Sequence, residues 1–240
     1  MNKKNQTFWE DITDEYDSLV GVQGDKHHRL VINPIVSDLL GDLHNKVVLD
    51  AACGNGYISK KMASNAQKVY GVDFNRKFID LARERHKGIG NLEFSVGNIM
   101  GLKFSDSFFD IVLCNMALIN VENLSLAVKE LSRVFKNGGS LVISITHPCF
   151  ENPPHVYTLR DKSGGNKGKV ITNYFYTGQV TNPENHHLHY HYMLSDYLNS
   201  FAESGLNLEK TVEPNGAEIM GSEEKDNTPL FLIIKLKKNK

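Results

Sequence analysis

Short apolar runs alternate with amphipathic segments along this 240-residue chain. Residues 47–50, 68–72, 141–145 and 230–236 are largely apolar runs of strand length. Near-continuous apolar strands indicate a sheet that is covered on both faces. The alternation therefore predicts an α/β fold, in which helices flank a mostly parallel sheet.

Between these runs, apolar residues recur at the three- and four-residue spacing of a helix. Residues 8–20 carry such a stripe, and so do residues 124–135 and 194–202. Asn33, which precedes a proline, and Asn75 are expected to cap two further helices. Strands and helices are thus predicted to alternate through the middle of the chain.

The most informative stretch follows the first predicted strand. Asp50 ends this strand, a loop with Gly54 and Gly56 follows, and the second strand ends in Asp73. Glycines let the backbone pass close beneath a ligand, and an acid at the end of the second strand can accept both hydroxyls of a ribose. This order predicts that a nucleoside binds at the carboxyl ends of the strands.

The loop is a poor match to a dinucleotide-binding fingerprint. Ser59 stands where that fingerprint has a third glycine, and Ala52 stands in place of the opening glycine. A methyl group at this position is compatible with a closely approaching ligand if φ is negative there. Asp50 would lie badly beside a pyrophosphate, but it suits a ligand with an ammonium or sulfonium group.

Residues 50–56 resemble motif I of the class I S-adenosylmethionine-dependent methyltransferases, which reads Asp-x-Gly-Cys-Gly-x-Gly. The resemblance continues in order through residues 69–75, 97–99, 108–112 and 135–139. It implies a Rossmann-like, seven-stranded, mostly parallel sheet. It also implies S-adenosyl-L-methionine as the cofactor and S-adenosyl-L-homocysteine as the product.

Three later motifs are similar to those of the type-11-like subgroup, which acts on small molecules. They are residues 147–150, residues 194–197 and the pair Glu213-Pro214. The resemblance therefore spans nearly the whole chain. It implies methyl transfer to a small-molecule acceptor.

The resemblance also implies roles for individual residues. Asp73 is expected to bind the ribose. The amide oxygen of Asn98 is expected to accept a hydrogen bond from the adenine amino group, where the family usually has an acid. Tyr16 and Arg29 are expected to bind the carboxylate of the amino-acid part. The complete set expected to bind the cofactor is Tyr16, Arg29, Asp50, Ala52, Gly54, Gly56, Asp73, Phe74, Asn98, Ile99 and Asn115.

We expect a single domain over residues 1–240, made of four parts. Residues 1–44 form an N-terminal helical cap, and residues 45–146 form the cofactor-binding core. Residues 147–192 are polar, aromatic and rich in histidine, and they separate the fifth strand from its following helix. Such an insertion is expected to lie over the strand ends as a substrate lid. Residues 193–240 supply the last helix and strands.

Methyl transfer requires mainly that nucleophile, methyl carbon and sulfur lie in line, with water excluded. His147 directly follows the fifth strand, and we expect it to act as general base or to orient the acceptor. His189 or His191 would assist it. The alternative is that His147 only fixes the turn before Pro148.

Other functions fit the residues less well. Asn152-Pro153-Pro154-His155 is similar to a motif of nucleic-acid amine methyltransferases, but it follows the fifth strand instead of the fourth. Alternate histidines in residues 186–191 would share one face of a strand, yet no acidic cluster accompanies them, so we expect no metal site. A non-catalytic S-adenosylmethionine sensor or partner subunit and a Rossmann-type oxidoreductase remain as alternatives.

Composition agrees with this interpretation. The net charge is −1 and no basic stripe is evident, so we expect no nucleic-acid partner. No apolar run approaches the roughly 20 residues of a membrane span, and nothing near the start is typical of a signal peptide. The 3 cysteines lack a metal-binding spacing, which favours a cytoplasmic protein. We expect a monomer or a homodimer.

Overall fold

The computed structural model describes residues 3–151, 155–164, 166–181, 188–216, 219 and 228–238. The helical segments are α1 (Lys3–Asp11), α2 (Thr13–Val20), the π-helical turn η1 (His28–Ile32), α3 (Asn33–Leu40), α4 (Tyr57–Ala63), α5 (Arg76–Arg85), the 3₁₀ turn η2 (Leu118–Asn120), α6 (Leu124–Val134) and α7 (Leu194–Glu203). The strands are β1 (Val47–Ala51), β2 (Lys68–Asp73), β3 (Leu92–Val96), β4 (Phe109–Asn115), β5 (Phe135–Thr146), β6 (Val156–Arg160), β7 (Asn166–Ile171), β8 (Gly178–Thr181), β9 (Leu188–His191), β10 (Leu206–Val212) and β11 (Phe231–Lys238).

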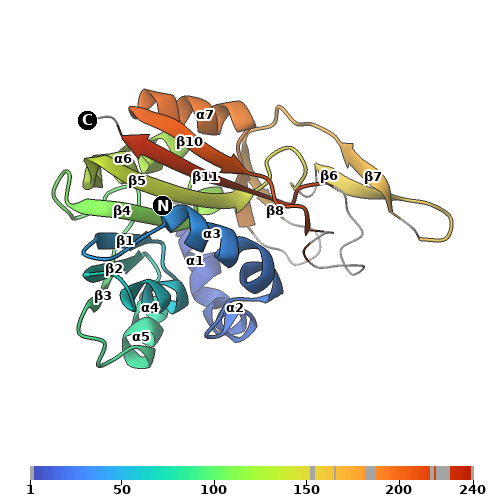
Figure 1. The fold of residues 1–240 in the computed structure, drawn as a ribbon. Coiled ribbons are helices and arrows are strands. Elements are labelled where there is room, and N and C mark those ends of the chain that lie inside the picture. Colours follow the sequence, from blue (N-terminus) through green and yellow to red (C-terminus); the bar gives the residue numbers. More distant parts are fainter. Residues whose placement is uncertain are drawn as a thin grey trace.

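Seven strands form one sheet in the order β10-β11-β5-β4-β1-β2-β3 (Figure 1). The strands β1 to β5 pair in parallel, whereas β11 pairs antiparallel with both β5 and β10. The order reverses at β1, which pairs with β2 on one side and β4 on the other. Ligands of open α/β sheets bind at this kind of switch point, beyond the carboxyl ends of the strands. The predicted seven-stranded, mostly parallel sheet is confirmed.

Both faces of the sheet are covered, as the apolar strands predicted. Leu141 and Ile143 of β5 lie in an apolar cluster with α6 and α7, and Val142 between them lies in a second cluster with α3 and α4. All three side chains are fully buried. Successive side chains of a strand point to opposite faces of the sheet, so one continuous apolar run contributes to both cores.

The N-terminal segment forms two helices where one was predicted. The backbone of Ile12 leaves the helical region between α1 and α2, with φ −92° and ψ 5°. The predicted cap at Asn33 is also wrong in detail, because η1 runs directly into α3 and Asn33 itself lies within the helix. In Figure 1, α1 and α2 lie together below the sheet, and the two helices contact each other.

The insertion after β5 forms two small antiparallel sheets, β6–β7 and β8–β9. The β6–β7 hairpin projects from the body of the molecule (Figure 1). Several of its apolar side chains face solvent, since Tyr157 is 52% exposed and Leu159 is 50% exposed. The predicted Asn152-Pro153-Pro154 turn, His186 and His187 lie outside the described residues.

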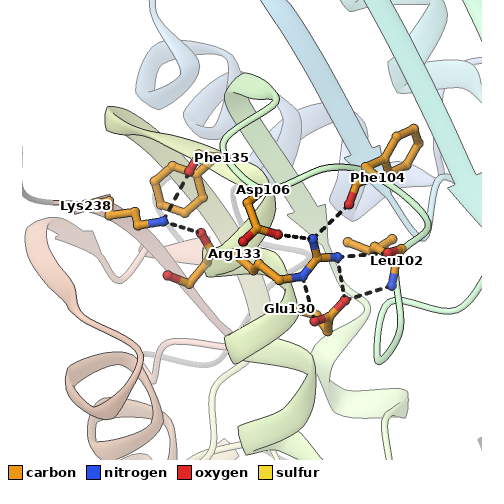
Figure 2. Close-up of polar contacts among 8 residues, drawn as sticks. Leu102, Phe104, Asp106, Glu130, Arg133, Phe135 and Lys238 are labelled. Atoms are coloured by element: carbon orange, nitrogen blue, oxygen red, sulfur yellow. Dashed lines mark hydrogen bonds and ion pairs between the residues drawn. The ribbon is translucent and has the colours of Figure 1, made fainter.

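Arg133 on α6 fixes the loop that leads into β4 (Figure 2). Its guanidinium group donates hydrogen bonds of 2.8 Å to the carbonyl oxygens of Leu102 and Phe104. It also pairs with the carboxylates of Glu130, at 2.9 Å, and Asp106, at 2.7 Å. These hydrogen bonds, first of all those with Glu130, raise the pKa of Arg133. The guanidinium group of Arg133 therefore holds this loop in place, although the loop has no regular secondary structure.

Candidate cofactor site

A cavity lies at the carboxyl ends of β1, β2 and β4, at the switch point of the sheet. Together with the open solvent at its mouth, it encloses about 890 Å³. Most residues predicted to bind the cofactor line it, namely Tyr16, Asp50, Ala52, Gly54, Asp73, Phe74, Asn98, Ile99 and Asn115. Arg29 and Gly56 do not.

The loop after β1 begins in a left-handed conformation. Ala52 has φ +63°, so the condition of a negative φ at this residue is not met. A left-handed conformation costs a residue with a Cβ atom about 1–2 kcal/mol, which a glycine would avoid. The Cys53 N–H donates to the carbonyl oxygen of Val72 at 3.0 Å and ties the loop to β2. Ala52 therefore adopts a backbone conformation that glycine adopts more easily, and the loop is locally strained there.

The two glycines of the loop have different tasks. A Cβ atom on Gly54, which has φ +52°, would meet no other atom within 4 Å. A Cβ atom on Gly56, with φ +78°, would lie 2.5 Å from the Phe94 ring. Gly54 therefore leaves the cavity open for a ligand, whereas Gly56 lets the start of α4 approach β3.

Asp73 presents a buried carboxylate at the end of β2. Its two oxygens accept hydrogen bonds of 2.9 Å from the backbone N–H groups of Gly54 and Asn75. Burial nevertheless raises its pKa to about 6. Each oxygen has a further lone pair, so the carboxylate is fixed in place and can still accept two hydroxyl groups.

Asp50 is a second buried acid, and it is only 2% exposed. The Ser59 hydroxyl donates to its Oδ2 atom at 2.5 Å. Burial and the nearby charge of Asp73 raise the pKa of Asp50 to about 7, although the bond from Ser59 opposes this rise. A buried acid of this kind favours a cationic ligand, because the positive charge offsets the loss of hydration.

Phe74, Asn98 and Ile99 line the end of the cavity beyond Asp73. The side-chain oxygen of Asn98 accepts the Met100 N–H at 2.9 Å, so it already shapes its own turn. One lone pair of this oxygen remains for an amino group. An aromatic ring, an aliphatic side chain and an amide are suitable neighbours for a purine base.

The N-terminal helices form the opposite wall, with Trp9, Tyr16 and Val20. Asn75 holds them, since its amide donates to the Trp9 carbonyl oxygen at 3.0 Å and to the Thr13 hydroxyl at 2.9 Å. The Asn75 side-chain oxygen also caps α5, as predicted. One fully buried amide thus joins the wall of the cavity to the strand that carries Asp73.

The glycine loop holds the same segment at a second point. The side-chain amide of Asn55 donates at 2.8 Å both to the Asp17 carboxylate and to the Gly21 carbonyl oxygen. Asp17 also forms an ion pair with Arg85 of α5. The segment is therefore tied to both loops that surround Asp73.

The structure places His28 in the wall, where the sequence had suggested Arg29. The Arg29 side chain is exposed. Both residues belong to η1, and adjacent positions of a helical turn point in different directions. The contact of Arg29 with the cofactor stays a prediction, and its side chain does not line the cavity.

Comparison with known proteins bears on what binds in this cavity. A family described as a methyltransferase domain matches residues 49–143. A demethylmenaquinone methyltransferase from Staphylococcus haemolyticus is 29% identical over 164 residues, which cover 65% of this chain and 68% of the relative. Another from Lactococcus lactis is 31% identical over 60% of this chain and 59% of its own length.

Residues 49–143 carry a methyltransferase domain, and the chain has the fold of the class I S-adenosylmethionine-dependent methyltransferases. An S-adenosylmethionine-dependent methyltransferase from Mesorhizobium loti has the same fold, with a TM-score of 0.78 and 21% identity over 91% of this chain and 100% of that one. The corresponding values for a similar protein from Listeria monocytogenes are 0.75 and 23%, over 86% and 97%. The chain is therefore an enzyme that uses S-adenosylmethionine. Among its described helices, none has the length and apolarity that a membrane span requires.

The insertion of this methyltransferase supports the cavity from behind. The lining residues include none of the described residues of 147–192, which we had expected to cover the strand ends. Instead Tyr192 donates from its hydroxyl to the carbonyl oxygen of Val121 at 2.9 Å, and β9 lies against η2. Asn120 and Val121 in turn line the cavity. The insertion thus packs against residues that line the cavity and does not line it itself.

His147 of the methyltransferase faces protein groups, and it is only 2% exposed. Its Nδ1 atom accepts the Cys149 N–H at 3.2 Å, and its Nε2 atom lies 2.8 Å from a Glu213 carboxylate oxygen. Both ring nitrogens are therefore engaged, and His147 does not line the cavity. This geometry agrees with the alternative that His147 fixes a turn, and its role as a general base stays a prediction.

The two assisting histidines do not reach the cavity either. The ring nitrogens of His191 lie 2.5 Å from the Tyr176 carbonyl oxygen and 3.3 Å from that of Pro148. His189 lies two residues before His191 on the same strand, and it too is outside the wall. In the described part of the chain, no three His, Cys, Asp or Glu side chains gather as metal ligands.

Several wall residues escaped the sequence analysis, among them Trp9, His28, Tyr57 and Asn120. Trp9 lies within residues 8–20, the segment that carries the predicted apolar stripe, so the stripe was the available signal for it. His28 and Asn120 stand in short irregular turns, where periodicity carries no information.

Proposed function

We propose that this methyltransferase transfers the methyl group of S-adenosylmethionine to a small, largely apolar acceptor. The observation that carries the proposal is the joint placement of Asp50, Gly54 and Asp73 around one cavity at the switch point. The donor set suits the cofactor: one acid for the ribose, one acid for a cationic group and an open glycine loop between them.

In this proposal the backbone of Ala52 and Gly54 runs beneath the amino-acid part, and Asp73 holds the ribose. Phe74, Asn98 and Ile99 surround the adenine. When bound, the cofactor supplies a methyl group that is already activated by its sulfonium. The chain's own contribution is to orient the acceptor and to exclude water.

The remaining wall supports an apolar acceptor. Tyr57, Ile58, Met116 and Val121 offer apolar surface, and Asn120 offers an amide. Among the described residues, those that line the cavity include neither lysine nor arginine, in contrast to a groove for a nucleic acid. The relatives named demethylmenaquinone methyltransferases also support a small-molecule acceptor. Three free cysteines agree with a cytoplasmic location.

Binding of S-adenosylhomocysteine, measured by calorimetry, tests the proposed site. Asp73→Ala removes two charge-assisted hydrogen bonds to the ribose, so we expect it to cost about 2–4 kcal/mol of binding free energy. Asp73→Asn keeps one acceptor oxygen and should lose less.

Asp80→Ala is the matched control, because Asp80 is a 60% exposed carboxylate of α5 outside the cavity. It should bind like the wild type. Unchanged affinity in Asp73→Ala, or preferential binding of NAD, would refute the site. Methyl-transfer screening against cell metabolites then tests the acceptor class, and binding without any transfer would favour the sensor alternative.

A further inference from the structure

The β6–β7 hairpin and the turn that follows it gather exposed apolar side chains away from the cavity. The hairpin projects from the body of the molecule (Figure 1). Five large apolar side chains of this segment face solvent, namely Tyr157, Leu159, Ile171, Phe175 and Tyr176. Apolar side chains that gather on a surface mark a contact with a partner or a lipid surface.

The two faces of the hairpin differ in their surroundings. Tyr157 and Leu159 are two residues apart on β6, so they share one face, and both are about half exposed. Val156 points to the opposite face and is buried. On that face Lys169 forms an ion pair of 3.1 Å with Glu151, and the lysine side chain is only 10% exposed. The hairpin is therefore held to the body through one face and presents the other, with Tyr157 and Leu159, to solvent.

Positive charge gathers around the turn between β6 and β7. Residues 156–171 contain four basic side chains and one acid, Asp161, although the whole chain has a net charge of −1. Arg160 and Lys162 are exposed. Lys167 is 61% exposed and lies 3.7 Å from the Asp161 carboxylate. The projecting end of the hairpin is thus cationic, beside the exposed apolar face.

This combination favours an anionic lipid surface over a protein. Basic side chains bind acidic headgroups, a tyrosine ring suits the interface between headgroups and acyl chains, and a leucine side chain can enter the apolar layer. The open face is only five residues long and two strands wide. It covers on the order of 200 Å², whereas a standard protein interface covers about 800 Å² on each partner.

We propose that the β6–β7 hairpin docks this protein on the surface of an anionic membrane. Arg160 and Lys162 contact the headgroups, and Tyr157 and Leu159 enter the interface beneath them. Such peripheral binding requires no membrane-spanning helix. The inference goes beyond the proposed function, and it agrees with it, because an apolar acceptor would concentrate in the same lipid phase.

Sedimentation of the full chain with vesicles tests the proposal. One set of vesicles contains phosphatidylcholine alone, and the other an equal mixture of phosphatidylcholine and phosphatidylserine. Each basic side chain near an anionic surface strengthens binding about fivefold, so the wild type should bind the mixed vesicles at least roughly tenfold more tightly. Added salt should weaken this preference, because it screens the charges.

The double variant Leu159→Ser, Lys162→Gln removes one apolar anchor and one charge. We expect it to bind the mixed vesicles roughly 10- to 50-fold more weakly than the wild type. Lys162→Gln alone alters only an exposed side chain and should lose about fivefold.

Leu208→Ser, Lys210→Gln is the matched control on β10, where the leucine is 55% exposed and the lysine side chain 57% exposed. It should bind the mixed vesicles within about twofold of the wild type. Both double variants should bind S-adenosylhomocysteine like the wild type, because none of the four residues lines the cavity. This measurement shows that the variants are folded and separates the docking surface from the proposed cofactor site.

The inference is overturned if the wild type binds neither set of vesicles, or binds both equally. An equal loss in the two double variants would overturn it as well. Self-association of the wild type, or its binding to single-stranded RNA, without any binding to vesicles would assign the hairpin to a second copy or to a nucleic acid instead of a membrane.

Discussion

The N-terminal segment and the insertion after β5 both lie outside the core of the sheet, yet they differ in how they contribute to the site. The first lines the cavity with Trp9, Tyr16, Val20 and His28. The second contributes no described residue to the wall, although its aromatic and histidine content had indicated a substrate pocket. Composition therefore predicts poorly which peripheral segment covers a site.

The physical difference lies in buried polar contacts. The N-terminal segment is tied to the loops after β1 and β2 by the amides of Asn55 and Asn75, both nearly or fully buried. The insertion exposes much of its apolar surface, and Phe175 is 83% exposed. Unmade hydrogen bonds are costly inside a protein, so the buried amides hold their partners in register.

The largest expected effect comes from removing each region in turn. Deleting residues 1–20 opens one wall of the cavity, so we expect affinity for S-adenosylhomocysteine to fall roughly 100-fold, or about 2.7 kcal/mol. Replacing residues 156–171 with a short glycine linker should leave this affinity within about twofold, because the hairpin lies outside the wall. Calorimetry measures both.

Circular dichroism must show that both deletion proteins remain folded. The comparison between the regions fails if the chain without residues 1–20 binds as tightly as the full chain. It also fails if removal of the hairpin abolishes binding in a folded protein. Turnover of the hairpin deletion then shows whether the insertion affects the acceptor through η2.

Asn75→Ala tests the tie of the N-terminal segment. It removes the cap of α5 and the two hydrogen bonds that the Asn75 amide donates to the Trp9 carbonyl oxygen and the Thr13 hydroxyl, so we expect a loss of about 2–3 kcal/mol in the free energy of unfolding. Urea unfolding measures this loss, and limited proteolysis should then cut within residues 1–20 first.

His147→Gln is the matched change on the side of the insertion. Glutamine keeps one donor and one acceptor, so a loss of about 1 kcal/mol in stability and an unchanged affinity for S-adenosylhomocysteine are expected. A selective loss of turnover in this variant would instead restore His147 as a base. Equal destabilisation by both variants would remove the contrast between the two regions.

A smaller effect on cofactor affinity concerns Asp50, which lines the same cavity as the N-terminal segment. With its pKa raised to about 7 by burial, Asp50 of the free protein binds a proton as the pH falls through 7. The ligand's amino group favours the charged carboxylate, so binding releases this proton and is weaker at lower pH. From about pH 7.5 to about pH 6 we expect a loss of up to roughly tenfold in affinity.

Calorimetry in buffers of different ionisation enthalpy detects the released proton. Asp50→Asn cannot titrate and should lack this part of the pH dependence. 5′-Methylthioadenosine has no amino group, so its binding should follow pH less steeply than that of S-adenosylhomocysteine. Equal slopes for wild type and Asp50→Asn would exclude Asp50 as the titrating group.

Local patterns predicted the sheet and much of the cavity. Asp50 and Asp73 each end a strand, and strand ends can be found from apolar runs alone. Because parallel strands place their carboxyl ends at one edge, both acids meet there without further information. The departures occur at Ala52, whose φ depends on its neighbours, and at Arg29, whose direction depends on an unpredicted π-helical turn.

The sequence by itself thus determined the order of elements, the glycine loop and the acids that flank the cavity, since these depend on contacts between adjacent elements of the chain. Only the tertiary structure decided which peripheral segment closes the site. The deciding contact joins Asn75 to Trp9 across 66 residues, and the His147 ring finds Glu213 at the same separation of 66. Neither partner leaves a periodic signal, because a buried side-chain hydrogen bond is selected by three-dimensional proximity and not by spacing along the chain.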